Sequence, residues 1–437
     1  MWKLLIRFLL MLAVSFYLFP FMFTFLPTDT LNTKNLMAGF GFLAFVFDSI
    51  RKRSMKLSEP TLFAAMLAAI FSVWCLYSVT ASNTYEMDYA SYIMSFFIWM
   101  AGAYGVYALL GLVHEKVTLE ILVRYLAAVG LFQCVIAVLI DNVGAVDSFV
   151  DRIMYVPGDY YRVNHRMYGL GAALDPAGIR FSVILIMIAH LFSTNANVRS
   201  NGTYQALLLG SYAVILVIGA VISRTTVIGG AMGIVYIIIS LFRMRKGGFV
   251  TLRMVQAFFW FFIVLAVIIG VTIYLYRSSE TFYGYVRFGF EGFFSWVETG
   301  EFTTGSTDVL ETMWVWPGDL HTWIFGRGTY GVYENYSDIG YVNFVFYCGL
   351  VGLVIFSIYF LYCHLVLNRK FNNFHIASWM LVALTFIVWL KVTSDIFFID
   401  ALLFCIAGDY DDDAVLTGDA VNILPDDIGV RKLQRRI

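Results

Sequence analysis

Residues 206–245 read ALLLGSYAVILVIGAVI-SRTT-VIGGAMGIVYIIISLF-RMR, and this stretch decides the fold class. Its two apolar runs, 206–222 and 225–242, are each long enough to cross a bilayer as a helix. A short polar segment around Arg224 separates them. Basic residues close the second run, as is typical of the cytoplasmic side of a membrane. The stretch therefore predicts two membrane-spanning helices joined by a tight turn.

The composition of the whole chain extends this prediction. Of the 437 residues, 60% are hydrophobic and 14% are charged, whereas a soluble domain is about 25% charged. The mean hydropathy of +0.77 is more than one soluble core can bury. These values exclude a soluble enzyme, a disordered protein and a nucleic-acid binder. We predict an all-α fold, a polytopic integral membrane protein with about twelve transmembrane helices and two long outer loops.

Lysine and arginine clusters near residues 51–53, 243–245 and 369–370 fall on one side of this pattern. Because short cytoplasmic loops carry the positive excess, we expect both termini in the cytoplasm. We expect a single transmembrane domain over 1–408, with its first run retained, and a charged cytoplasmic tail over 409–437. The apolar runs that we predict to be spans are 4–26, 35–50, 61–81, 89–113, 121–140, 177–195, 206–222, 225–242, 252–275, 339–367, 375–391 and 394–408.

Two long loops lie on the opposite, outer side, at about 141–178 and 277–338. Long loops are usually functional or disordered, and the second loop holds sixteen aromatic residues, unlike a disordered segment. Helix-like spacing from Phe282 to Val297 predicts a helix on the membrane surface there. Apart from histidine, the basic residues of both loops are arginines. Guanidinium groups bind phosphate bidentately, so these arginines predict a phosphate-bearing lipid ligand.

Five arginines carry this hypothesis. Arg162 and Arg166 lie in the first loop, Arg327 lies in the second, and Arg180 and Arg224 adjoin apolar runs. A charge that adjoins a hydrocarbon span is costly and usually functional. The loops also contain many acidic residues, nine in the second loop alone, so salt bridges are the alternative explanation for a loop arginine.

Asp338 is the candidate general base, and it precedes a helix that we expect to begin near Gly340. A carboxylate at this position could instead cap the helix. Within that helix, Gly349 and Gly352 are spaced for close helix packing. Three tryptophans of the second loop are candidates for stacking on sugar rings, although anchoring at the membrane interface explains them as well. They are Trp314, Trp316 and Trp323.

Other polar features are given structural interpretations. The glycines after Arg166 could cradle a phosphate with their amides. Lys391 and Asp395 bracket a turn, and we expect them to pair with each other. His165 and His321 are interpreted as ordinary loop histidines, and the acidic cluster at 409–413 as a solvated surface. The five cysteines lie within apolar runs and predict neither a disulfide nor a metal site.

Three separated motifs together resemble a known family. The first is Arg166-Met-Tyr-Gly-Leu-Gly with Asp175-Pro-Ala-Gly-Ile-Arg180, and the second is Ser223-Arg224-Thr225. The third is Phe325-Gly-Arg-Gly328, followed by Asp338-Ile-Gly-Tyr and the helix with Gly349 and Gly352. In order and spacing they resemble the Wzy-type O-antigen and capsular polysaccharide polymerases, which are related to the O-antigen ligases.

The resemblance implies a GT-C-like architecture and glycosyl transfer at the outer face of a bacterial inner membrane. The implied partners are undecaprenyl-pyrophosphate-linked oligosaccharides, membrane lipids and a chain-length-regulating copolymerase, with no metal or other cofactor. It implies that Arg166 and Arg224 stabilise the pyrophosphate and that Asp338 accepts the acceptor's proton. The ligase branch usually has histidine at the position of Asp338, so aspartate favours a polymerase. A ligase acting on lipid A core and a flippase of lipid-linked oligosaccharides are the alternatives.

Overall fold

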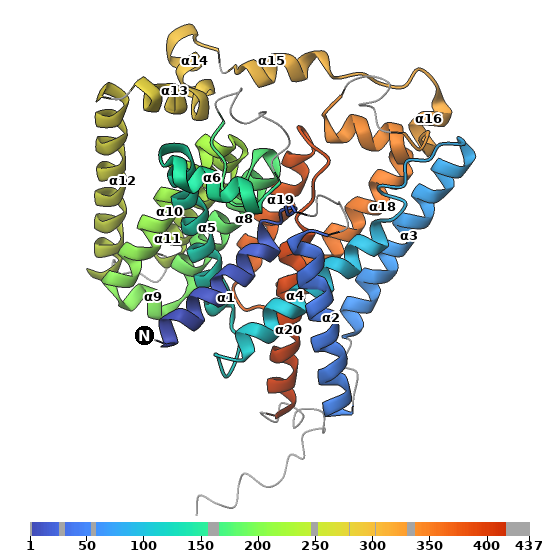
Figure 1. Cartoon of the computed structure of the whole chain (residues 1–437), viewed down its shortest axis with the longest axis horizontal. Helices are drawn as coiled ribbons and strands as arrows, with labels where there is room; N and C mark the ends of the chain where they lie inside the picture. Colours follow the sequence, from blue (N-terminus) through green and yellow to red (C-terminus); the bar gives the residue numbers. More distant parts are fainter. Residues whose placement is uncertain are drawn as a thin grey trace, which may run out of the picture.

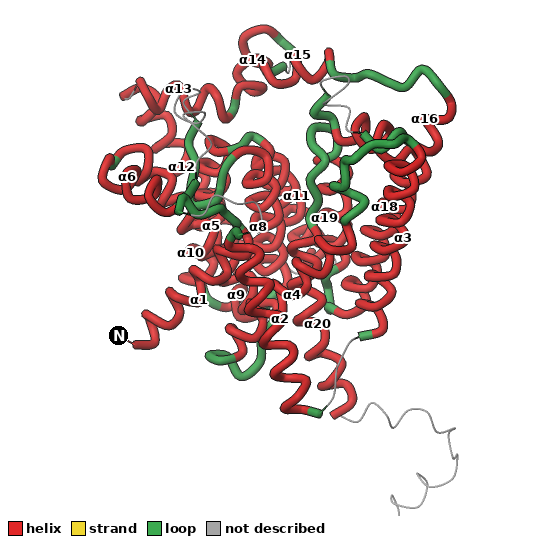
Figure 2. Tube along the Cα trace, turned by 45° about the vertical axis from the view of Figure 1, so that its right-hand side comes forward, coloured by secondary structure: helices red, strands yellow, loops and turns green. Residues whose placement is uncertain are grey.

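The computed structural model describes residues 2–25, 31–53, 58–155, 166–245, 252–278, 280–301, 303–329 and 337–416. Within these ranges the secondary structure is helical apart from two isolated β-bridges, which confirms the predicted all-α class (Figure 2). The helices are α1 (Trp2–Leu18), α2 (Thr33–Lys52), α3 (Glu59–Ala81), α4 (Tyr92–Gly111), α5 (Leu119–Asn142), α6 (Gly144–Ile153), α8 (Leu174–Thr194), α9 (Ala196–Ser200), α10 (Gly202–Ile222), α11 (Thr225–Arg245), α12 (Leu252–Ser278), α13 (Glu280–Gly289), α14 (Glu291–Thr299), α15 (Gly305–Thr312), α16 (Leu320–Phe325), α18 (Gly340–Lys370), α19 (His375–Val388) and α20 (Phe397–Leu416).

Six of the described helices, α3, α4, α5, α8, α10 and α18, are long and apolar enough to cross a membrane. Shorter apolar segments occur in α11, α19 and α20. Large apolar side chains also cover outward faces, and Phe47, Val73 and Val354 are each more than half exposed. Such a surface is unfavourable in water and favourable in lipid, so the chain is membrane-embedded. A helix lies in each of the twelve predicted ranges, and the number that cross the membrane stays a prediction.

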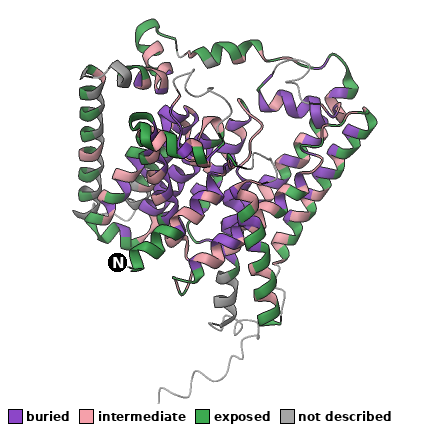
Figure 3. Ribbon diagram, in the orientation of Figure 1, coloured by how far each residue is buried: buried purple, intermediate pink, exposed green. Residues whose placement is uncertain are grey.

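Helix α8 lies at the centre of the bundle and is buried along most of its length (Figure 3). A helix that is apolar on every face needs neighbours on every face. Hydrogen bonds lock it to α11, because the Ser182 hydroxyl donates to the Thr225 carbonyl (2.8 Å) and accepts from the Gly229 amide (3.3 Å). The polar residues Asp175 and Arg180 lie in the first two turns of this helix.

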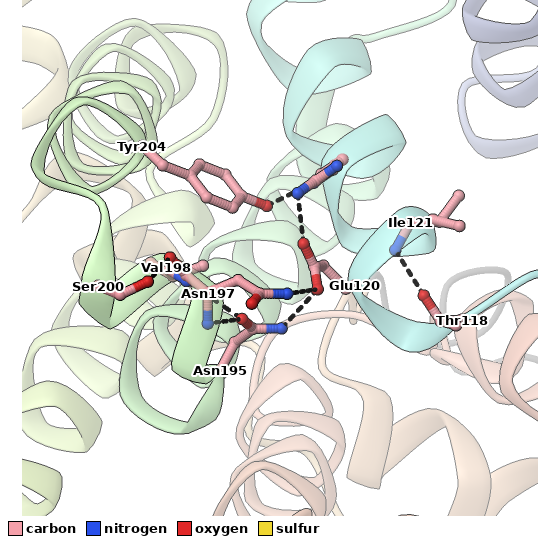
Figure 4. A network of polar contacts seen from close by, with 9 residues as sticks. Thr118, Glu120, Ile121, Asn195, Asn197, Val198, Ser200 and Tyr204 are labelled. Carbon is pink, nitrogen blue, oxygen red and sulfur yellow. Dashed lines mark hydrogen bonds and ion pairs between the residues drawn. The ribbon is translucent and has the colours of Figure 1, made fainter.

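Helices α13–α16 gather at one end of the bundle, which we call the loop end (Figure 1). The N-terminal residues and α9 lie at the other end, which we call the basic end because the basic last turns of α2, α9 and α18 lie there. A polar network holds α5 to α9 and α10 at the basic end (Figure 4). Glu120 forms an ion pair with Arg124 and accepts a hydrogen bond from the side-chain amide of Asn195 (2.7 Å). Arg124 also donates to the Tyr204 hydroxyl (2.5 Å).

The predicted continuous run 339–367 is wrong in one respect, since α18 breaks at Gly349 with φ 66° and ψ −178°. A residue with a Cβ would be strained at this φ, and the Cβ would also meet the Ile324 carbonyl oxygen at 2.2 Å. The carbonyls freed by the break are bonded by other segments. The Arg327 amide donates to Phe346 O (2.6 Å), and the Trp74 indole donates to Cys348 O (2.8 Å). The two halves of the third sequence motif therefore pack directly on each other.

Three further boundaries differ from the predicted ones. Helix α1 ends at Leu18, well before residue 26, because Pro20 cannot donate to a continuing helix. The helix predicted from Phe282 to Val297 is two helices, α13 and α14. Helix α20 continues to Leu416, so the predicted tail begins as helix, and residues 417–437 lie outside the described residues.

Candidate functional site

The first two sequence motifs meet at the loop end, at the N-terminus of α8. The Asp175 carboxylate accepts from the Thr225 hydroxyl (2.8 Å) and, more weakly, from the Ser223 hydroxyl (3.4 Å). It also forms an ion pair with Lys391 (2.8 Å), which lies between α19 and α20. Asp175 thus joins three segments that are far apart in the sequence.

Arg166 and Arg224 converge on one aromatic ring, that of Phe288 in α13. The guanidinium carbon of Arg224 lies 4.0 Å from the ring centre and that of Arg166 lies 5.6 Å from it. Within the described part of the chain Arg166 contacts this ring and makes no hydrogen bond or ion pair. Two cations on one ring repel each other, so an anion bound between or beside them would be stabilised.

Arg224 is also the residue that fastens the α13–α14 segment to the bundle. Its Nε donates to the Phe288 carbonyl (2.8 Å), and its Nη2 lies 2.5 Å from Glu291 Oε2. Burial lowers the pKa of Arg224, an effect that Glu291 opposes and Arg166 reinforces. Salt bridging, the alternative considered for the loop arginines, thus describes part of the environment of Arg224.

Arg180 reaches into a cavity of about 310 Å³ at the N-terminal ends of α4, α8 and α20. Its guanidinium lies over the ring of Phe398 (5.3 Å), and its Nη1 donates to the Pro176 carbonyl (2.7 Å). Its Nη2 makes no hydrogen bond among the described residues and is not fully buried, so it remains open to a ligand in the cavity. Its Nε is buried and also makes no hydrogen bond within the described part of the chain, which costs about 1–3 kcal/mol.

Asp395 lies on the same cavity, and its position corrects one prediction. Lys391 does not pair with it, because Lys391 is bound to Asp175 from the central helix. The carboxylate of Asp395 accepts instead from the Tyr92 hydroxyl (3.0 Å) and from the Phe397 amide (2.9 Å). Asp395 was predicted as the partner of Lys391 because the two are four residues apart, but the fold places Asp175 of α8 against Lys391 instead.

The three tryptophans of the second loop form one cluster near α16. Trp316 stacks on Trp323 (5.1 Å between ring centres) and lies 5.7 Å from Trp314. The Trp323 indole donates to the Pro317 carbonyl (2.9 Å), which fixes its orientation. Arg327 follows α16 and lies over the ring of Phe346 in α18 (4.8 Å). Helix α16 lies beside α3 and α18, and the Ser78 hydroxyl of α3 donates to the Phe325 carbonyl at its end, whereas Arg224 binds α13 and α14 (Figure 1).

Asp338 precedes α18, which begins at Gly340 as predicted. The capping alternative is wrong for this carboxylate, because the N-cap residue is Ile339 and no side chain caps the helix. The Asp338 side chain is exposed, and three residues later the Tyr341 amide donates to the Trp389 carbonyl (3.0 Å). Asp338 therefore lies near the segment that carries Lys391, but it does not line the cavity.

Three further predictions concern the first loop and its neighbours. Arg162 and His165 lie outside the described residues. The phosphate cradle after Arg166 is not supported, because the Gly169 amide donates to Ala172 O (2.8 Å) and the Gly171 amide contacts Met154 Sδ (3.1 Å). Among the described residues, no group of three or more His, Cys, Asp or Glu could hold a metal ion.

The cavity residues other than Arg180 were not predicted as a site. Asp395 is the second residue of the predicted span 394–408, and Lys34, which lies outside the lining with its ammonium over the ring of Trp99 (5.1 Å), directly precedes the predicted span 35–50. A charge that adjoins an apolar run is the signal that singled out Arg180 and Arg224, and it applies equally to Lys34 and Asp395.

No family model, curated protein or solved structure matches this chain. Its function is therefore inferred from the residues at the loop end.

Proposed function

We propose that the chain is a membrane glycosyltransferase that polymerises lipid-linked oligosaccharides at the outer face of a bacterial inner membrane, with both termini in the cytoplasm. The growing chain would be transferred from undecaprenyl pyrophosphate to a sugar hydroxyl of a fresh repeat unit. The anomeric carbon would form a bond to the acceptor oxygen as its bond to the pyrophosphate oxygen breaks. Undecaprenyl pyrophosphate would leave with the electron pair, and the acceptor's proton would pass to a carboxylate.

The observation that carries this proposal is the pair of guanidinium groups on the ring of Phe288. Arg166 has no hydrogen bond or ion pair among the described residues, so none of those residues competes with an anion for its donors. Fixed guanidinium donors stabilise the negative charge that grows on a leaving pyrophosphate. Arg224 lies on the same ring and would add its charge while it holds α13 in place.

The carboxylate that we propose as general base is Asp338. Its exposed side chain could release the proton to water after each transfer. Asp338→Asn is a clean test, since no helix-capping contact of this side chain is lost. We expect Asp338→Asn to abolish polymer formation, and full activity would remove Asp338 from the mechanism.

The experiment that tests the proposed function is complementation of a host strain that lacks this gene. We expect the wild-type chain to restore long polymer and the Arg166→Ala variant to leave single repeat units attached to the cell envelope. Complete loss of attached saccharide would instead indicate the ligase. Accumulation of lipid-linked repeats on the cytoplasmic side would indicate the flippase.

A further inference from the structure

We propose that the cavity at the N-terminal ends of α4, α8 and α20 is a subsite for one uncharged sugar ring. This proposal rests on the proposed function, because the ring would belong to the lipid-linked saccharide that the enzyme uses. The cavity is distinct from the Phe288 ring to which Arg166 and Arg224 are bound.

First, the cavity lining holds one side chain with an unused hydrogen-bond donor and one with unused acceptor sites, Arg180 and Asp395. Arg180 makes one hydrogen bond among the described residues, from Nη1 to the Pro176 carbonyl, and its Nη2 is unbonded there and not fully buried. Asp395 accepts two hydrogen bonds, from Tyr92 and Phe397, although a carboxylate can accept about four. Within the described structure, Arg180 and Asp395 line the same cavity without forming an ion pair. The ligand that satisfies both must accept from a guanidinium and donate to a carboxylate, as a hydroxyl group does.

The second step concerns charge. An anionic ligand would be repelled by Asp395 and by Asp88, which lies at the exposed part of the lining. A cationic ligand would be repelled by Arg180 in the lining, and by Lys34, which lies outside the lining over the ring of Trp99. Charges of both signs thus surround the cavity, and this favours an uncharged polyol over an ion of either sign.

The third step concerns the apolar part of the lining. Aromatic rings expose flat apolar faces that match the C–H faces of a sugar ring. The tyrosines are fixed by their hydroxyls, since Tyr89 donates to Thr393 O (2.8 Å) and Tyr92 donates to Asp395 (3.0 Å). The aromatic residues of the lining are Tyr89, Tyr92, Trp99 and Phe398.

The fourth step concerns size. The volume of about 310 Å³ equals the liquid volume of roughly ten water molecules. It lies at the lower limit of the range for ligand pockets, which fits one ring and not a chain of sugars. The neighbouring sugars would therefore lie outside, past the exposed Asp88.

The experiment measures protection of a cysteine placed in the cavity at Ser95, in the purified full-length protein. The native cysteines Cys75, Cys134, Cys348 and Cys363 are buried, and the half-buried Cys405 is replaced by alanine. The Ser95→Cys variant reacts with N-ethylmaleimide with and without methyl glycosides of neutral hexoses and N-acetylhexosamines. The matched control is Tyr85→Cys, at a residue that is 92% exposed and does not line the cavity.

We expect at least one neutral glycoside to slow the reaction of Ser95→Cys about tenfold at ten times its Kd, because roughly a tenth of the sites then remain open. Tyr85→Cys should react at the same rate with and without the glycoside. Adding Arg180→Gln or Asp395→Asn should remove the protection, measured as the ratio of rates with and without sugar in the same variant, because each substitution also changes the reactivity of the thiol itself. The acidic sugar glucuronate and the basic sugar glucosamine should protect less.

Equal reaction rates with and without every neutral glycoside would overturn the subsite. Stronger protection by glucuronate would overturn its uncharged character. The assay needs no turnover, so its failure is distinct from failure of the proposed function. Protection without polymerisation would refute only the proposed function, and polymerisation without protection would refute only the subsite.

Discussion

Both ends of the helical bundle hold ion pairs, but the loop end also holds arginines with donors that no described residue uses. At the basic end, Glu120 and Arg124 are bonded to each other and to Asn195 and Tyr204 (Figure 4). At the loop end, Arg166 has only an aromatic partner among the described residues, and Arg180 keeps a buried donor unused. Charges whose hydrogen bonds are complete hold helices together. Charges with unused donors in a membrane protein are costly, and a ligand that binds them explains why they are kept.

Replacing Arg166 by alanine should have the largest effect at the loop end. We expect the amount of polymer to fall about 100-fold, because one fixed donor to a growing negative charge is worth about 10²–10³ in rate. Protein abundance should stay near normal, since the described contact that is lost is with the Phe288 ring. Arg166→Lys should also be poorly active, because an ammonium lacks the planar fork. Polymer length on gels and immunoblots of the membrane fraction measure the two quantities.

The matched control is Arg287→Ala. Arg287 is also an arginine of the second loop, but it forms an ion pair with Glu298. We expect wild-type polymer from this variant. An equal loss in both variants would mean that any positive charge in these loops supports activity, and the contrast between Arg287 and Arg166, which has no ion pair among the described residues, would fail.

Arg224 both holds α13–α14 to the bundle and lies on the Phe288 ring beside Arg166, so its replacement should lower both stability and activity. Arg224→Ala removes the bonds to the Phe288 carbonyl and to Glu291, and we expect both about tenfold less polymer and faster proteolysis within α13–α14. Glu291→Gln removes only the ion pair, which is worth about 1 kcal/mol, so proteolysis should accelerate about fivefold. Polymer from Glu291→Gln should be near the wild-type amount. Loss of polymer from Glu291→Gln comparable to that from Arg224→Ala would assign Arg224 a purely structural role.

At the basic end, Glu120→Gln should affect stability alone. The substitution removes the ion pair with Arg124 and keeps an acceptor for Asn195, so we expect a loss of about 1 kcal/mol and a melting temperature lower by about 2 °C. Thermal unfolding in detergent and polymer length in cells measure the two effects. A marked loss of polymer at an unchanged melting temperature would show that Glu120 takes part in the reaction, and the basic end would then not be purely structural.

The smallest effect that we predict is a pH dependence at α16. Asp319 caps this helix, and hydrogen bonds from the Thr322 amide and hydroxyl lower the pKa of Asp319. Its folded-state pKa thus lies below the unfolded value of about 3.9, so the cap stabilises α16 above that pH and is lost as the pH falls through the folded pKa. We expect amide exchange of residues 320–326, corrected for intrinsic rates, to accelerate on acidification. The Asp319→Asn variant should show no such change.

Much of the fold could be predicted from the sequence, because the length of an apolar run is a local property. The exceptions have non-local causes. Gly349 and Gly352 predicted helix packing, but the break at Gly349 depends on the Ile324 backbone and on the donors Trp74 and Arg327, which come from distant segments. The partner of Lys391 was predicted from sequence proximity, whereas α8 supplies it.

The candidate site could be predicted only in part. Arg166, Arg180 and Arg224 were selected because a charge close to hydrocarbon is costly unless it has a function. Arg180 lies in the first turns of α8, and Arg224 lies close enough to Arg166 and to Asp175 of α8 to interact with their charges. The cavity itself joins residues from three helices, and no sequence pattern gives the distance between Arg180 and Asp395.

The most direct test of the central claim is polymerisation by the purified protein in vesicles that contain an undecaprenyl-pyrophosphate-linked oligosaccharide from the native host. The wild type and Arg287→Ala should lengthen the saccharide and release undecaprenyl pyrophosphate at similar rates, and Arg166→Ala should be slower by about 100-fold. Equal rates from Arg166→Ala and the wild type would contradict the claim that Arg166, which has no ion pair among the described residues, binds the pyrophosphate.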